Sequence, residues 1–272
     1  MGRLHLGDAC ECRKTNPQYL LYAMKPSVAL QQALATAALC CTPVAIADTL
    51  PKEASIEVGA AAYSYKETSL GMEIKGLQSF VAGRYAHGID STKQLVFDGR
   101  YAAGSLAYSS QSTGSVGGEP NYLLDLRGAI SLRNNATFGF YDAYIGLGSR
   151  YLVNDAEGLF TTTGHYGYRR LSRYIYVPAG LTFHANNNSI ETNLEYDLLL
   201  RGQQTSYLHG YTAQNAQTKG FGFRASVLFK KDKWAFGPYA HYWKIQESDM
   251  DAGLFEPANT TTEMGLKLRY DF

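Results

Sequence analysis

Acidic and basic residues recur two positions apart in several otherwise apolar segments of the chain. Asp125 and Arg127 have this spacing, as do Glu195 and Asp197, and side chains two residues apart lie on the same face of a strand. The sequence predicts a charge network in an enclosed space, formed by Asp125, Arg127, Asp142, Glu195, Asp197, Arg224 and His241. Because both signs are present, we expect a plug of salt bridges. The alternative is a narrow polar channel for ions or small solutes.

A second set of residues has the types that hydrolytic enzymes use. Asp249 and Asp251 form a carboxylate pair, and His209 or His165 could supply an imidazole to activate water. Ser206 lies near His209, as a nucleophile lies near its base. Because such residues are ordinary in solvated loops, we expect no enzyme activity and no catalytic, cofactor or metal site.

The elements that must position these residues are strands. Apolar and polar residues alternate in ten segments, and the connections between them are short or long in turn. This pattern predicts an all-β fold, a transmembrane antiparallel up-and-down β-barrel of about ten strands with both termini and the short turns on the periplasmic side. The expected strands are 55–66, 72–87, 94–109, 122–133, 136–152, 173–185, 189–203, 219–231, 234–247 and 261–272, and the long loops are 111–121, 153–172, 204–218 and 248–260.

Two hairpins can be given an expected register. A turn at Asn134 and Asn135 would place Leu124 opposite Ile145 and Arg127 opposite Asp142. A turn at Asp232 and Lys233 would place Arg224 opposite His241. Strict alternation also predicts that Arg201 faces inward. Pro178 and Pro238 lie inside expected strands, where each would lose a ladder hydrogen bond, so we expect them to mark bulges.

The last strand has an apolar outer face and an aromatic C-terminal residue. Its apolar residues are Met264, Leu266, Leu268, Tyr270 and Phe272. The pattern resembles the C-terminal targeting strand of Gram-negative outer-membrane β-barrels, although Gly265 is not in the usual register of that signal. The resemblance implies a cell outer membrane location. It also implies contact with outer-membrane lipids, lipopolysaccharide, periplasmic chaperones and the barrel assembly machinery.

The other end of the chain predicts export. Residues 24–47 combine a basic start, an apolar run and the sequence Ala45-Ile-Ala47, as in a secretory signal peptide. Residues 1–23 are then an extension before the true start at Met24, and residues 48–272 form the barrel domain. All four cysteines lie within residues 1–47, so no Cys-based metal site is expected in the barrel.

The charge balance argues against nucleic acid as a partner. Residues 1–47 contain 4 of the 25 basic and 2 of the 24 acidic residues, which leaves the remainder with a formal net charge of −1. Nucleic-acid-binding domains carry a basic excess.

The loop 153–172 holds the most distinctive candidate contact residues. They are His165, Tyr166, Tyr168, Arg169 and Arg170, types that favour recognition of an extracellular protein or glycan. We expect an integral outer-membrane protein that is structural or adhesin-like, with a porin-like channel as the alternative. The omptin proteases, ten-stranded barrels with two acidic residues on one wall and an Asp/His pair on the other, are a partial resemblance. Asp249 and Asp251 match the first pair, but no Asp-x-His accompanies His209 or His165.

Overall fold

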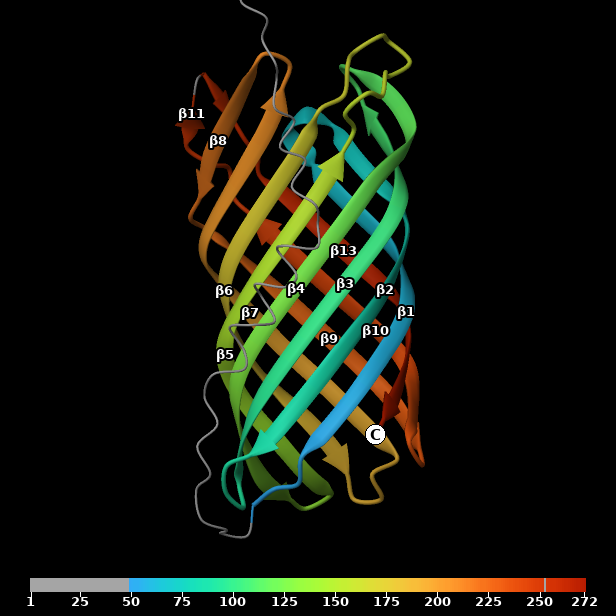
Figure 1. Ribbon diagram of the computed structural model, residues 1–272, viewed down its shortest axis with the longest axis vertical. Coiled ribbons are helices and arrows are strands. Elements are labelled where there is room, and N and C mark those ends of the chain that lie inside the picture. The colour runs from blue at the N-terminus through green and yellow to red at the C-terminus, as the bar shows by residue number, and fades with distance from the viewer. Residues whose placement is uncertain (1–48, 252) are drawn as a thin grey trace, which may run out of the picture. The chain divides into compact units, whose positions relative to one another are not determined.

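The computed structural model describes residues 49–251 and 253–272 as an antiparallel β-barrel (Figure 1). Residues 1–48, which include the expected signal peptide, lie outside the described part. The strands are β1 (Glu53–Glu67), β2 (Met72–Gly88), β3 (Lys93–Ser110), β4 (Gly114–Ala136), β5 (Gly139–Asp155), β6 (Arg169–Ala185), β7 (Ile190–Leu208), β8 (Tyr211–Gln217), β9 (Gly220–Lys231), β10 (Trp234–Ile245), β11 (Met250–Asp251), β12 (Leu254–Phe255) and β13 (Asn259–Asp271). A single-turn 3₁₀ helix, η1 (Thr68–Leu70), follows β1. In the described residues no helix is long and apolar enough to cross a bilayer.

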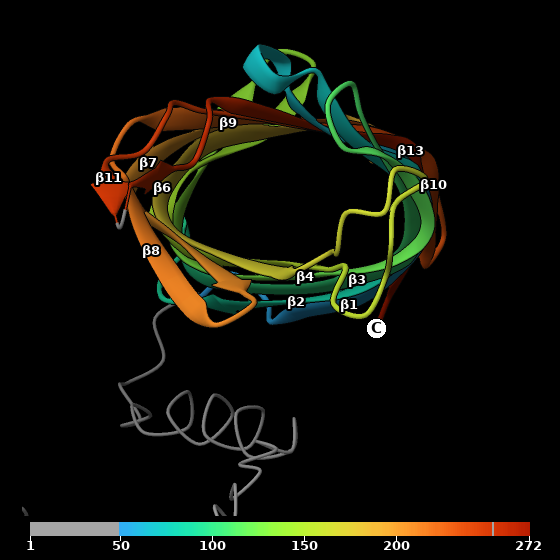
Figure 2. The same ribbon diagram turned by 90° about the horizontal axis from the view of Figure 1, so that it is seen from above.

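The wall closes because β1 pairs with β13 as well as with β2 (Figure 2). β7 pairs with β8 at Gly202 and Gln217 and with β9 at Leu198 and Phe221, in one unbroken register. β8 and β9 are therefore two parts of a single strand, interrupted at Thr218 and Lys219. The closed ten-stranded antiparallel barrel confirms the predicted fold class.

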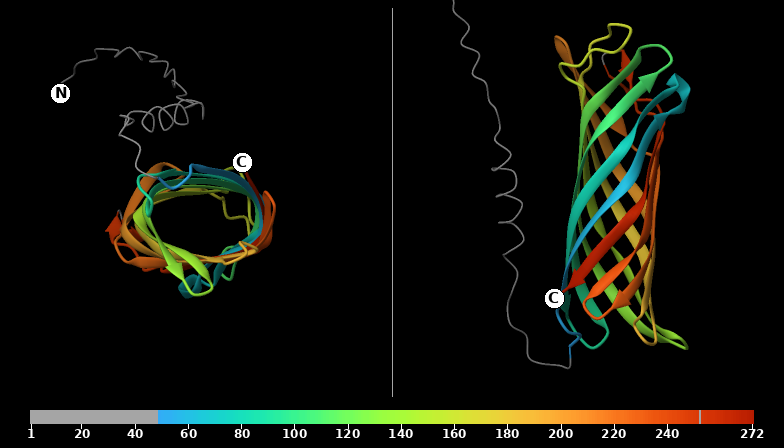
Figure 3. Two further views of the ribbon diagram at one scale, coloured as in Figure 1. Left: turned by 90° about the horizontal axis from the view of Figure 1, so that it is seen from below. Right: turned by 90° about the vertical axis from the view of Figure 1, so that its right-hand side faces the viewer.

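The outer surface is apolar at alternate positions, as the sequence predicts. On β13, Met264 and Leu266 are 61% and 53% exposed, whereas the inward-facing Glu263 on the same strand is 1% exposed. The five apolar residues of the expected assembly signal all lie on β13 and its end, and that role stays a prediction. The start of β1 and the C-terminus lie at the end of the barrel that carries the short turns (Figure 3), which is the periplasmic end in the predicted orientation.

One predicted hairpin register is wrong and the other is confirmed. β4 and β5 turn at Thr137 and Phe138, so Leu124 lies opposite Tyr151 and Asp142 opposite Arg133. The turn ends at Gly139, whose φ of 150° lies in a region that favours glycine. The shift between the predicted and observed pairings is an even number of residues, so every side chain keeps its face. Between β9 and β10, His241 lies opposite Arg224 as predicted.

The inward direction predicted for Arg201 is also wrong. Ile175 pairs with Arg201 and Tyr176 with Leu199, which leaves Leu200 as an extra residue in β7. Leu199 is buried, as regular alternation requires, but the bulge reverses the alternation after it, so Arg201 is exposed. The prolines do not cause it, because Pro178 remains paired with Asp197 and Pro238 with Leu266 in the regular registers.

Two expected loops are largely strand. β3 and β4 leave 111–113 as a turn, and β7 and β8 turn tightly between Leu208 and Tyr211. Their Gly, Ser, Thr and Gln residues are typical of loops. Two such polar segments can still pair as strands when each directly extends a strand that is already part of the barrel wall. The wall therefore continues beyond the band of exposed apolar side chains, which we call the apolar belt, on the predicted extracellular side. The strands extend to the end of the barrel opposite the C-terminus (Figure 1).

Candidate functional site: the barrel lumen and its extracellular rim

Arg224 is the centre of the charged residues inside the barrel. Its Nε donates to Asp197 on neighbouring β7 at 2.8 Å. Its Nη2 donates to Asp125 at 2.8 Å, and Asp125 is on β4, with β5, β6 and β7 between it and β9. The hydroxyl of Tyr176 donates to Asp125 at 2.5 Å and accepts from Arg224 at 2.8 Å. These contacts join opposite walls through the middle of the lumen.

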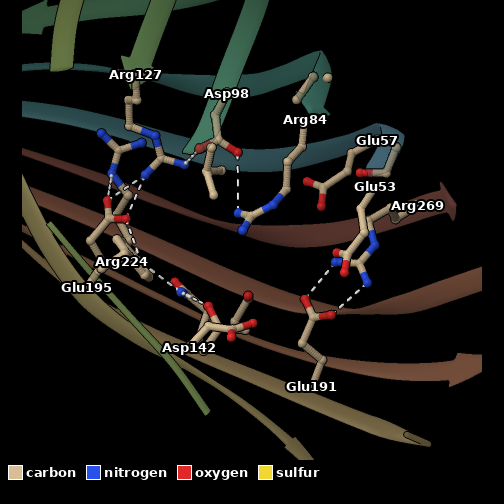
Figure 4. A pocket seen from close by; sticks show the side chains of 18 of the residues that line it. Glu53, Glu57, Arg84, Asp98, Arg127, Asp142, Glu191, Glu195, Arg224 and Arg269 are labelled. Carbon is tan, nitrogen blue, oxygen red and sulfur yellow. Dashed lines mark hydrogen bonds and ion pairs between the residues drawn. The ribbon is translucent and has the colours of Figure 1, made fainter. Parts of the chain in front are cut away.

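Two further arginines also bridge distant strands. Arg127 on β4 donates to both carboxylate oxygens of Glu195 on β7, at 2.6 and 2.7 Å (Figure 4). Arg100 on β3 donates to Glu263 on β13 at 2.7 Å. Each pair is separated by two other strands in the wall.

The charges of this central group balance. Its members are Arg100, Arg127, Arg150 and Arg224 with Asp125, Glu195, Asp197 and Glu263, a group we call the lumen plug. The four carboxylates are at most 5% exposed. Buried charges persist when they are paired in this way, and the plug leaves no net charge to attract a counterion.

The structure brings together five of the seven predicted lumen residues: Asp125, Arg127, Glu195, Asp197 and Arg224. Asp142 lies in a different group, 2.9 Å from Arg133 and 3.4 Å from His184. His241 faces inward beside Arg224. Sequence reasoning missed Tyr176, although it shares the inward face of β6 with the even-numbered residues around it.

The lumen differs above and below the plug. Toward the extracellular end, buried side chains fill it, in one cluster of Tyr63, Tyr65, Met72, Ile74 and Leu106 and another of Tyr174, Tyr176, Leu199, Trp243 and Ile245. Toward the periplasmic end, a cavity of about 340 Å³ extends from Asp125 and Arg224 to Lys52 and Phe272 at the rim. The cavity therefore ends at the plug.

The prediction that Arg170 contacts an extracellular partner is wrong. Arg170 is 6% exposed, and its Nη1 lies 2.6 Å from Glu67 and 3.5 Å from Glu256. The hydroxyl of Tyr65 lies 2.9 Å from both carboxylates. The guanidinium of Arg170 thus forms ion pairs with two carboxylates inside the barrel, and it is not presented to an extracellular partner. Burial, opposed by Arg170 and reinforced by Glu67, raises the pKa of the loop residue Glu256 to about 7.

Other predicted loop residues form part of the exposed tip, by which we mean the loop 156–168 and the β7–β8 turn beside it. Tyr166 packs edge-on against Phe160, with 5.2 Å between ring centroids, and lies 6.3 Å from the ring of His209. His165 is exposed, and its Nδ1 lies 2.9 Å from Thr163 Oγ1. The guanidinium of Arg169 lies over the ring of Tyr207 at 4.6 Å, while Tyr168 is half-buried.

The candidate hydrolytic residues have structural contacts. Asp249 accepts the backbone N–H of Ala216 at 2.5 Å, and Asp251 accepts that of Gln214 at 2.8 Å. These two carboxylates cap the free edge of β8. Ser206 is 7% exposed inside the wall, whereas His209 is exposed at the turn, so the structure does not bring that pair together.

No family model matches the sequence, and no curated protein is significantly similar to it. Several solved structures are similar to it. The outer membrane protease OmpT of Escherichia coli has 9% identity and a TM-score of 0.53, over 85% of this chain and 99% of that one. The translocator domain of the autotransporter NalP from Neisseria meningitidis has 10% identity and a TM-score of 0.44, over 90% and 94%. Ail of Yersinia pestis, solved with the heparin analogue sucrose octasulfate, has 14% identity and a TM-score of 0.35, over 82% and 100%.

The closed antiparallel wall, the apolar exterior and the charged interior of this protein are features of outer-membrane barrels. The protein is an outer-membrane β-barrel protein, as the sequence predicts.

Proposed function

We propose that this protein is a non-conducting outer-membrane barrel that binds an extracellular protein or glycan through its exposed tip. The observation that carries the proposal is the lumen plug. Its residues Arg224, Arg127 and Arg100 each bind a carboxylate on a strand that is not adjacent to their own, across the lumen. An open pore needs a continuous polar path, and aromatic clusters lie above the plug. Function is then carried by the surface outside the cell.

The tip has the chemistry of a recognition surface. Phe160, Tyr166 and Tyr211 are 64%, 47% and 49% exposed, and Thr163 and His165 add polar atoms beside them. Exposed aromatic rings at a polar surface supply large contact areas with hydrogen-bonding edges. The aromatic rings are held by one another, because Tyr166 packs against Phe160 and faces His209 on the β7–β8 turn.

The test compares binding and conductance in the same preparations. Cells that display the barrel are screened on extracellular-matrix proteins and glycan arrays, and the variant Phe160→Ser/Tyr166→Ser is compared with Leu70→Ser, a similarly exposed apolar residue on η1. Binding that is lost in the tip variant and kept in the control supports the proposal. Binding that survives in both, or no binding to any target, contradicts it.

A channel is the second candidate, because the periplasmic cavity reaches the plug at Asp125 and Arg224. Planar-bilayer recordings of the purified barrel decide between the two. We expect an electrically silent barrel, and reproducible stepwise conductance that changes in an Arg127 or Arg224 variant would favour the channel.

A further inference from the structure

Four cations form a row on the outer wall, away from the tip. They are Arg173 on β6, Arg201 on β7, Lys219 at the interruption between β8 and β9, and Lys244 on β10, and all four are exposed. Among the ion pairs of the described residues, none involves these four side chains. The row therefore presents positive charge to its surroundings.

The strand registers place the four cations side by side. Arg201 lies opposite Ile175, two residues from Arg173 on the same strand. The common register of β7 with β8 and β9 puts Lys219 opposite Leu200, next to Arg201. Lys244 lies opposite Phe221, two residues from Lys219. Diagonal neighbours on adjacent strands are within reach of long side chains, so one ligand can contact several of them.

The wall directly below this row is apolar. Leu198, Leu200 and Phe223 are 47%, 51% and 50% exposed on the same outer face. Farther down, small residues hollow the surface into a groove, where Ala143, Ala179 and Ala225 lie among Ile130, Leu132, Ile145, Leu181, Leu194, Tyr196 and Phe223. From Arg201 to Tyr196 is roughly 17 Å along β7 at the usual strand rise of about 3.3 Å per residue. That length suits an acyl chain.

We propose that this face is a binding site for a phosphorylated, acylated lipid of the outer leaflet. The phosphates contact Arg173, Arg201, Lys219 and Lys244, and an acyl chain lies in the groove beside Ala179. An anionic polysaccharide would use the cations alone, whereas an amphiphile uses the cations and the groove together. The row also lies where the apolar belt gives way to the extracellular wall, which is the level of lipid headgroups.

The bulge in β7 creates part of this site. If Leu200 were paired regularly, with no bulge, Arg201 would face the lumen, as strict alternation predicts. Because of the bulge, Leu200 and Arg201 are both exposed, so an apolar residue and a cation are adjacent on one face. A bulge that redirects a side chain in this way fits a binding function.

The experiment measures lipopolysaccharide binding to the full barrel in nonionic detergent, by titration and by the shift in thermal unfolding temperature. The test variant is Arg173→Gln/Arg201→Gln/Lys219→Gln/Lys244→Gln. The matched control removes four exposed lysines from the periplasmic end, as Lys52→Gln/Lys93→Gln/Lys231→Gln/Lys233→Gln. We expect affinity at least about tenfold lower in the test variant and unchanged affinity in the control. Equal affinity in both variants would overturn the proposal.

Three further measurements separate the ligand chemistries. Dephosphorylated lipopolysaccharide should bind more weakly to the wild type, and Ala179→Leu, which fills the groove from outside the wall, should weaken binding of the intact lipid. Inorganic phosphate should not compete. Tight binding of the deacylated polysaccharide, or full competition by phosphate, would show a site for the anion alone and reject the lipid site. If the fourfold variant does not fold, Arg201→Gln and Lys244→Gln are measured singly, and no loss in either rejects the proposal.

Discussion

Arg224 and Asp125 meet in the middle of the barrel, with 2.8 Å between Nη2 and Oδ2, although their strands are separated by three others. Such a contact forms only when the wall has closed. The ion pairs that fill the lumen therefore form together with the closure of the barrel.

Replacing Arg224 should destabilise the barrel strongly. In Arg224→Ala, the buried carboxylates of Asp125 and Asp197 lose their main partner, and removing one member of a buried ion pair typically costs about 3–5 kcal/mol. Urea unfolding followed by tryptophan fluorescence measures the change. Arg173→Ala, an exposed control, should change the free energy of unfolding by less than about 0.5 kcal/mol. Adding Asp125→Asn and Asp197→Asn to Arg224→Leu should recover much of the loss, and no recovery would argue against a charge effect.

The extracellular loop that contains Glu256 should pack more loosely as pH rises. Burial raises the pKa of Glu256 from its ordinary 4.5 to about 7, so the folded state binds this proton more tightly than the unfolded state does. The stability contributed by the protonated group is complete below 4.5 and is lost as pH rises through about 7. Hydrogen exchange of residues 246–258, corrected for intrinsic rates, should be faster at pH 8 than at pH 6. Glu256→Gln should remove the difference, and a persistent difference would assign it to another group.

Asp249 and Asp251 should matter for the edge of β8 and not for hydrolysis. In Asp249→Ala and Asp251→Ala, the backbone N–H groups of Ala216 and Gln214 lose their acceptors. A lost hydrogen bond of this kind costs about 1 kcal/mol, so amide exchange at those two residues should be about fivefold faster. Peptide-cleavage assays should show no activity to lose. Peptide cleavage by the wild type that is abolished by both substitutions would favour the hypothesis of an omptin-like protease.

The bulge at Leu200 can be tested with cysteine labelling. Residues 48–272 contain no cysteine, so a single introduced thiol is unambiguous. Arg201→Cys should react with an impermeant maleimide, because the side chain is exposed, and Leu199→Cys should not, because it is 5% exposed. An Arg201→Cys thiol that is as unreactive as Leu199→Cys would contradict the bulge, because regular alternation places both side chains inward.

The sequence predicts what depends on local alternation. Ten strands, the outward face of β13 and the pairing of Arg224 with His241 follow from residue patterns and one tight turn. The turn between β4 and β5 does not, because registers that differ by an even number of residues keep every side chain on its face. The bulge in β7 is at Leu200, which is neither glycine nor proline, so the outward direction of Arg201 could not be predicted from the sequence.

Contacts through the lumen are harder still to predict. Alternation and turn residues predict Arg127 opposite Asp142 across a hairpin, but its partner is Glu195, three strands away. Nothing within either segment encodes that distance. It depends on the curvature of the closed wall, as does the burial of Arg170 beside Glu67 and Glu256.

The extracellular extension of the wall has a mechanical consequence. β3, β4 and β7 continue without interruption from the apolar belt to the tip, and β4 alone spans 23 residues. A partner that pulls on the tip therefore loads many ladder hydrogen bonds at the same time, as well as the membrane anchor below them. A bond made there would resist flow and shear better than one made by a flexible loop of equal length.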